Sequence, residues 1–296
     1  MNNLNVEFKL DRIHCHDEGD GIGNAEPYLW TVFFKVDGDT CVVNSDGPSI
    51  FLQGTPTVIT TPGNHGNLGD TDVDEGDDVN IPSIIGEYRT VMKPIPLTTP
   101  VFGVSEVGGM IGCITVLMEE DNTSNSAIQL GHEALDRSVR DRLQEVMGRL
   151  AVSNPEPTEE DFKAMSDAIG SAVADAIRHG VSIGDWILAF GNMDDQVGSE
   201  VFRFSHSGLE GAGGTSIPFT KRWQSEGDWE IFGHIKATVI PRPRQDDKCC
   251  EEMKGRIKEL EAKLAAHGKR IFLLERPDLQ RTPTVKPKVK LTKTRV

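Results

Sequence analysis

The amino-acid sequence predicts an α+β protein: mainly an antiparallel β-sandwich, with an inserted amphipathic helical hairpin and a C-terminal coiled-coil helix. Three patterns predict this fold class. Apolar and polar residues alternate near the N-terminus, the apolar period changes to that of a helix after residue 124, and a heptad pattern follows the last expected strand. We therefore expect a β-rich domain at 1–243 containing the hairpin at 124–182, a coiled-coil helix at 244–276 and a disordered basic tail at 277–296.

Strands are expected on both sides of the hairpin. Four apolar residues alternate with polar neighbours, which is the period of a half-buried strand: Leu4, Val6, Phe8 and Leu10. The run 28–36 is rich in aromatic and β-branched residues and ends in a turn signal, Asp37-Gly38. The run 110–118 is apolar without alternation, which indicates a strand buried on both faces. Later strands are expected at 186–190, 200–204 and 229–239.

The hairpin is expected to contain two amphipathic helices. In the first, one apolar face is formed by Ile128, Leu135, Val139, Leu143, Val146 and Leu150. Ser126 and Gln129 fit a capping box at its start. Thr158 and Asp161 predict the start of the second helix, and Gly180 predicts its end.

Charge is unevenly distributed along the 296 residues, whose formal net charge is −15. The stretch 269–296 holds nine basic and two acidic residues, a net +7, which leaves −22 on the preceding 268 residues. Because nucleic-acid phosphates would repel such an acidic body, we expect no nucleic-acid partner for it. The basic tail suits an acidic protein surface or an anionic membrane, although a purely solubilising tail explains it equally well.

Cysteine usage and the N-terminus predict a cytoplasmic protein. The five cysteines are odd in number and irregularly spaced, which argues against a disulfide framework. The first nine residues contain no basic segment followed by an apolar run, so no secretory signal is expected.

Acidic loops containing glycine form the main candidate site. Ca²⁺ binds about six to eight oxygens from carboxylates and carbonyls on flexible turns. We expect calcium ligands among eleven residues of four loops: Asp17, Glu18, Asp20, Glu26, Asp37, Asp39, Asp70, Asp72, Asp74, Asp194 and Asp195. The alternative is that these carboxylates are solvated surface charges. The calcium hypothesis requires that the loops converge in space.

Two of these loops precede similar stretches of sequence. Residues 20–28 and 195–202 share an acidic residue, an aliphatic residue, a glycine and a small polar residue, followed by Glu and an aromatic residue. A duplicated loop–strand unit would explain the similarity, and so would chance in a chain rich in Gly and Asp.

The C-terminal helix is expected to mediate self-association or to bind a helical protein partner. Its apolar positions alternate at spacings of three and four: Cys250, Met253, Ile257, Leu260, Leu264, His267, Ile271 and Leu274. A single amphipathic helix docked on the body is the alternative interpretation.

These features support three hypotheses. The leading one is a non-enzymatic interaction and assembly module with calcium-binding loops. The second is a membrane-active effector that uses the hairpin and the basic tail. The third is a metal-dependent hydrolase that uses His14, His16 and His65 with nearby carboxylates. Neither a nucleophile elbow nor a P-loop is present in the sequence, so an enzyme is not favoured.

Overall fold

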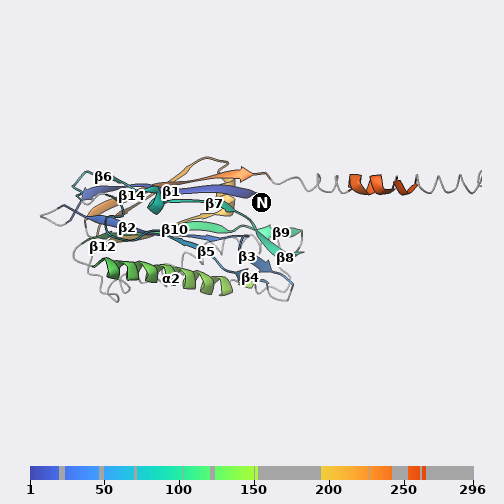
Figure 1. Ribbon diagram of the computed structural model, residues 1–296, viewed down its shortest axis with the longest axis horizontal. Coiled ribbons are helices and arrows are strands. Elements are labelled where there is room, and N and C mark those ends of the chain that lie inside the picture. Colours follow the sequence, from blue (N-terminus) through green and yellow to red (C-terminus); the bar gives the residue numbers. More distant parts are fainter. Residues whose placement is uncertain are drawn as a thin grey trace, which may run out of the picture. The chain divides into compact units, whose positions relative to one another are not determined.

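Three β-sheets and one long helix account for most of the body of the protein in this computed structural model (Figure 1). The chain divides into two units, Met1–Pro241 and Arg242–Val296, and each is treated by itself. The structure describes residues 1–19, 24–46, 50–69, 72–101, 103–120, 124–149, 151–152, 195–225, 227–241, 253–260 and 262–264.

The first sheet, called the outer sheet, is built around the long strand β1. Its strands, in spatial order, are β13 (Ile217–Trp223), β14 (Asp228–Ile240), β1 (Asn3–Asp17) and β6 (Asp78–Asn80), and β7 (Glu87–Met92) also pairs with β1. The turn of helix α1 (Ser83–Gly86) connects β6 to β7. The predicted alternation in β1 is confirmed, since Leu4, Val6, Phe8 and Leu10 are buried and their neighbours are less so.

The second sheet, called the central sheet, supplies the middle layer. In spatial order its strands are β12 (Asp195–Ser205), β10 (Met110–Glu119), β2 (Pro27–Val36) and β5 (Thr57–Thr60). Every residue of β2 and β10 is buried, as the lack of alternation in 110–118 predicts. Leu29 and Phe33 pack in the core shared with the outer sheet, whereas Trp30 and Phe34 pack in a second core beneath helix α2.

The third sheet extends the body beyond the end of the central sheet. In spatial order its strands are β11 (Ala151–Val152), β4 (Ile50–Gly54), β3 (Cys41–Asn44), β8 (Ile95–Val101) and β9 (Val104–Val107). The pair β3–β8 is parallel, and the other described strand pairs are antiparallel. The prediction of an α+β protein with a mainly antiparallel β body is therefore confirmed.

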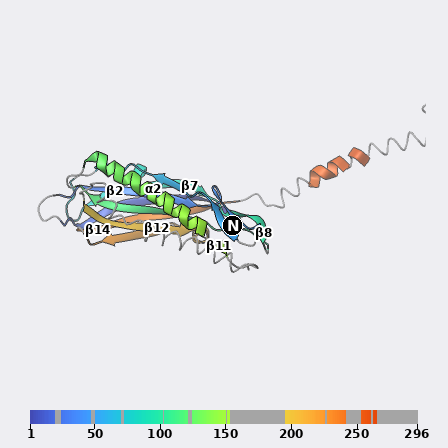
Figure 2. The ribbon, with the colours of Figure 1, turned by 90° about the horizontal axis from the view of Figure 1, so that it is seen from below.

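Helix α2 (Asn125–Arg149) covers the face of the central sheet that the outer sheet leaves open (Figures 1 and 2). The predicted apolar face is confirmed at Ile128, Leu135, Val139 and Leu143, all of which are buried. The helix start differs from the prediction: Ser124 rather than Ser126 caps it, because the Ser124 hydroxyl accepts the backbone N–H of Ala127 at 3.4 Å. The expected second helix of the hairpin lies outside the described residues.

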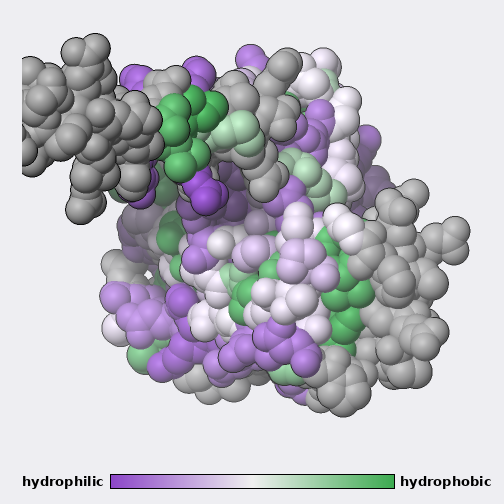
Figure 3. All heavy atoms as spheres, turned by 90° about the vertical axis from the view of Figure 1, so that its right-hand side faces the viewer, coloured by the Kyte–Doolittle hydropathy of each residue, from purple (hydrophilic) through white to green (hydrophobic). Residues whose placement is uncertain are grey.

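A short helix, α5 (His206–Gly211), follows β12 and, like α2, is capped by a serine hydroxyl. The hydroxyl of Ser205 accepts the backbone N–H of Gly208 at 3.1 Å. Figure 3 looks at the body from the right-hand side of Figure 1, and on this side hydrophobic residues form separate patches among hydrophilic ones.

Candidate functional site

Strand pairing gathers most of the described acidic loop residues at one end of the body, here called the acidic end. Asp17 at the end of β1 lies opposite Asp228 at the start of β14. Glu119 at the end of β10 lies opposite Pro27 on one side and Asp195 on the other. The left-hand side of Figure 1 is this end, where β1 and β10 finish and β2, β12 and β14 begin.

The described parts of the two similar stretches, 24–28 and 195–202, start at the acidic end. They contribute to β2 and β12, which flank β10 on opposite sides and are both antiparallel to it.

Backbone hydrogen bonds hold two of the acidic loops side by side. The N–H of Cys15 donates to the carbonyl of Asp77 at 3.0 Å, and the N–H of Gly76 donates to the carbonyl of Cys15 at 2.8 Å. Ala25 and Val73 exchange two backbone hydrogen bonds, at 3.0 and 3.1 Å. The segments 17–19, 24–26 and 72–78, separated by some fifty residues of chain in places, therefore form one surface.

Several carboxylates on this surface already accept hydrogen bonds. Asp17 accepts the N–H of Gly19 at 3.0 Å, and Asp77 accepts the N–H of Asp74 at 3.0 Å. Asp72 accepts a hydrogen bond from the side chain of Asn24. At the same end Asp74 is exposed and Glu18 is half-buried.

The thiol of Cys15 reports the electrostatics of the acidic end. Burial raises its pKa, and the negative charges of Glu18, Asp17 and Asp77 raise it further, to about 12, against the opposing effect of a backbone hydrogen bond at Asp17. Three carboxylates thus lie close enough to one buried sulfur to raise its pKa beyond the effect of burial.

The described side chains alone do not complete a metal site. Among them, no group of three or more His, Cys, Asp or Glu residues is arranged to hold a metal ion. Asp20, Asp70 and Asp194 of the predicted ligand set lie outside the described residues, and Asp195 is described through its backbone only.

Asp37 and Asp39 lie at the opposite end of the body from the other predicted ligands that the structure describes. They follow the end of β2, where Val36 pairs with Met110 at the start of β10. Their carboxylates contact lysines: Lys35 lies 3.0 Å from Asp37 and 2.6 Å from Asp39, and Lys93 lies 2.5 Å from Asp39. The structure therefore separates this pair from the acidic loops and gives it a local electrostatic role.

The three histidines of the hydrolase hypothesis contact three different carboxylates. His14 and His16 lie side by side on β1, with ring centroids 4.4 Å apart, as their spacing of two predicts. Nδ1 of His14 is 3.0 Å from Asp78, and Nε2 of His16 is 3.1 Å from Glu230. His65 instead contacts Glu120 at 2.9 Å.

One polar residue that the sequence did not single out, His132, is buried on the sheet-facing side of helix α2. It is 6% exposed, packs on the indole of Trp30 and lines a cavity of about 340 Å³ with the loop 61–64. Burial lowers its pKa to about 4, against the charges of Asp136 and Glu133. His132 lies on α2 one turn after Ile128, and no local sequence pattern distinguishes it from the other polar positions of the helix.

The C-terminal unit is helical at residues 253–260 and 262–264. The apolar positions of the predicted heptad pattern are here called the seam. Its described residues are strongly exposed: Met253 57%, Ile257 48%, Leu260 63% and Leu264 76%. Cys250 and Ile271, the other predicted oligomerisation residues, lie outside the described residues.

No protein-family model and no curated protein matches the chain. Of the helices that the structure describes, none combines the length and the apolar character needed to cross a lipid bilayer.

Proposed function

We propose that the protein is a non-enzymatic interaction and assembly module. In this proposal the acidic end binds calcium, and the C-terminal helix joins the chain to a second copy or to a helical partner. The observation that carries the proposal is the register of the strands. It brings the carboxylates of Asp17, Glu18, Asp72 and Asp74 from two separate loops to one end of the body.

The arrangement suits a cation better than a catalytic reaction. Carboxylates and loop carbonyls are the ligands that Ca²⁺ prefers, and the loops contain the glycines that let a chain wrap around an ion. Gly76 adopts a φ of 93° between Asp74 and Asp77, a left-handed conformation that glycine adopts readily. The carboxylates of Asp17, Glu18 and Asp77 lie near one another around Cys15, and a bound cation would relieve repulsion between them.

The exposed seam supports the assembly part of the proposal. Four large apolar side chains on one helix would each gain free energy of about 1.5–3 kcal/mol from full burial. A heptad seam reaches that burial by packing against a second seam.

Thermal unfolding of the full-length chain with calcium, with magnesium and with chelator tests the calcium site. A ligand at about one hundred times its dissociation constant stabilises the folded state by about 2.7 kcal/mol, which for a domain of this size raises the melting temperature by about 5 °C or more. We expect this rise with calcium and not with magnesium.

Two substitutions and a matched control locate the effect. Asp20→Asn and Asp72→Asn should each reduce the calcium-dependent rise, whereas Asp141→Asn, on the exposed side of α2, should leave it unchanged. A melting temperature that is equal with calcium and with chelator would refute the calcium site, and an equal loss in all three variants would place binding elsewhere.

A further inference from the structure

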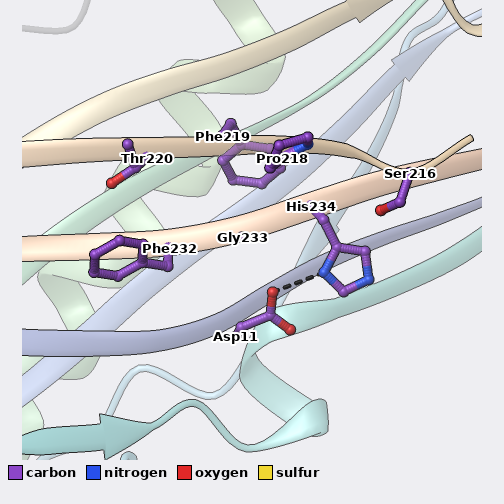
Figure 4. Close-up of a pocket in the computed structure, with 8 residues that line it drawn as sticks. All are labelled: Asp11, Ser216, Pro218, Phe219, Thr220, Phe232, Gly233 and His234. Atoms are coloured by element: carbon purple, nitrogen blue, oxygen red, sulfur yellow. Dashed lines mark hydrogen bonds and ion pairs between the residues drawn. The ribbon is translucent and has the colours of Figure 1, made fainter.

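A cavity of about 520 Å³ opens on the solvent-facing side of the outer sheet, midway along β14 (Figure 4). Pro218, Phe219 and Phe232 give it an apolar lining. Gly233 completes the floor of the cavity, where the chains pack closely: a Cβ there would lie 2.5 Å from the ring of Phe219 and 2.6 Å from the carbonyl of Lys9. Its volume is in the range of sites for small organic molecules.

One polar pair stands at the edge of this apolar lining. Nδ1 of His234 is 2.7 Å from Oδ2 of Asp11, and Figure 4 shows the two side chains facing each other from β14 and β1. Lys9 holds the other oxygen, since its Nζ is 3.1 Å from Oδ1 of Asp11. Asp11 is thus fixed by two partners and in turn fixes the orientation of the imidazole.

The partner of Nδ1 determines what Nε2 can do. An ionised carboxylate only accepts hydrogen bonds, so the ring hydrogen of neutral His234 lies on Nδ1. Nε2 is then the acceptor, and among the residues that the structure describes it has no hydrogen-bond partner. A ligand in the cavity that carries a hydrogen-bond donor can therefore bond to Nε2.

We propose that the cavity binds a small phenol-like molecule, whose ring packs on Phe232 and Pro218 and whose hydroxyl donates a hydrogen bond to Nε2 of His234. The aromatic and proline lining favours a flat apolar body. Arg12 supports the platform, with its guanidinium 3.9 Å from the centroid of the Phe232 ring. The neutral imidazole selects a hydroxyl over a methyl ether, because the ether has no hydrogen to donate.

Binding of 4-ethylphenol and of its methyl ether, 4-ethylanisole, to the full-length protein tests the proposal. Titrations followed by NMR at about pH 7.5, where free histidine is mostly neutral, should give a dissociation constant below about 1 mM for the phenol. The ether should bind about fivefold more weakly, which is the typical effect of one lost hydrogen bond.

A matched pair of histidine variants assigns the preference to one ring. His234→Phe keeps an aromatic ring and should bind the phenol and the ether equally. His16→Phe is the control. His16 lies on the neighbouring strand β1, contacts Glu230 and does not line the cavity, so this variant should keep the fivefold preference.

Asp11→Asn tests whether Asp11 determines which ring nitrogen of His234 carries the hydrogen. The new amide can donate to Nδ1, which moves the ring hydrogen to Nε2 and removes the acceptor. The preference for the phenol should then disappear while the fold, checked by circular dichroism, is retained.

Three results would overturn the proposal. The first is the absence of phenol binding at about 10 mM, a concentration at which even weak specific sites fill. The second is equal binding of the phenol and the ether to the unmodified protein. The third is tighter binding of 4-ethylbenzoate than of the phenol, which would indicate a site for anions instead.

Discussion

Lys35 and Asp37 form an ion pair of 3.0 Å inside the protein, with side chains that are 4% and 0% exposed. The carboxylate of Asp37 also accepts the backbone N–H groups of Lys93 at 2.8 Å and Asp39 at 3.1 Å. Burial opposes the charge of Lys35, yet the hydrogen bonds and charges of Asp39 and Asp37 outweigh it and raise the pKa of the lysine. A buried pair is stable when such additional hydrogen bonds satisfy both ions.

Asp37→Ala should therefore destabilise the fold by about 3–5 kcal/mol, because it leaves a buried ammonium with fewer partners and two N–H groups unpaired. Urea unfolding measures the change. Asp141→Ala is the control: Asp141 is exposed on α2, so its loss should cost about 1 kcal/mol or less. Equal effects of the two substitutions would contradict the assignment of Asp37 as the structural partner.

Any side chain larger than that of glycine at position 112 should destabilise the central sheet. A Cβ there would lie 2.4 Å from the ring of Phe34 and 2.6 Å from the carbonyl of Phe202. We expect Gly112→Ala to lower the free energy of unfolding by about 1–3 kcal/mol through overpacking. Gly211→Ala, where an added Cβ meets nothing within 4 Å, is the control and should be close to neutral. The prediction fails if chemical denaturation gives the same midpoint for both variants.

His132 should make stability depend on pH in mildly acidic solution. Its pKa is lowered from 6.5 to about 4, chiefly by burial, so the unfolded chain binds its proton first as the pH falls. The stabilisation from a neutral His132 is complete above pH 6.5 and is lost progressively as the pH falls to about 4, a total of about 3 kcal/mol.

The measurement is urea unfolding of the unmodified chain and of His132→Gln at about pH 7 and about pH 4.5. Subtracting the variant removes the contribution of the carboxylates, which both proteins share. The loss of stability between the two pH values should be smaller in the variant by about 2–3 kcal/mol.

The exposed seam should control the oligomeric state. If the C-terminal helix pairs with a second copy, Leu260→Glu together with Leu264→Glu places charges in the seam and should shift the molar mass in light scattering toward that of one chain. Lys258→Glu, off the seam of the same helix, should leave the mass unchanged. A single-chain mass for the unmodified protein would contradict self-association and would leave a different helical protein as the expected partner.

The sequence by itself determined the features that depend on local periodicity. The alternation at Leu4–Leu10 predicts the half-buried strand β1, and the unbroken apolar run at 110–118 predicts a strand covered on both faces. The steps between Ile128 and Leu143 predict the face of α2 that is buried. In each case the pattern is written in consecutive residues, because a strand or helix repeats its orientation every few positions.

Only the tertiary structure decided which acidic residues meet. Asp17 and Asp74 share one end of the body while Asp37 lies at the other, and all three occur in similar acidic, glycine-containing loops. Their positions follow from the direction and pairing of strands that are far apart in the chain. No local pattern encodes that pairing.

The same reason explains why the sequence could not reveal the His234–Asp11 pair or the buried environment of His132. Residues 11 and 234 meet because β1 and β14 are paired along most of their length, a contact across 223 positions of the chain. His132 is buried because the loop 61–64 and Trp30 close over it. The chemistry of both histidines depends on these distant neighbours, which determine their burial, their hydrogen bonds and the ligands that they can bind.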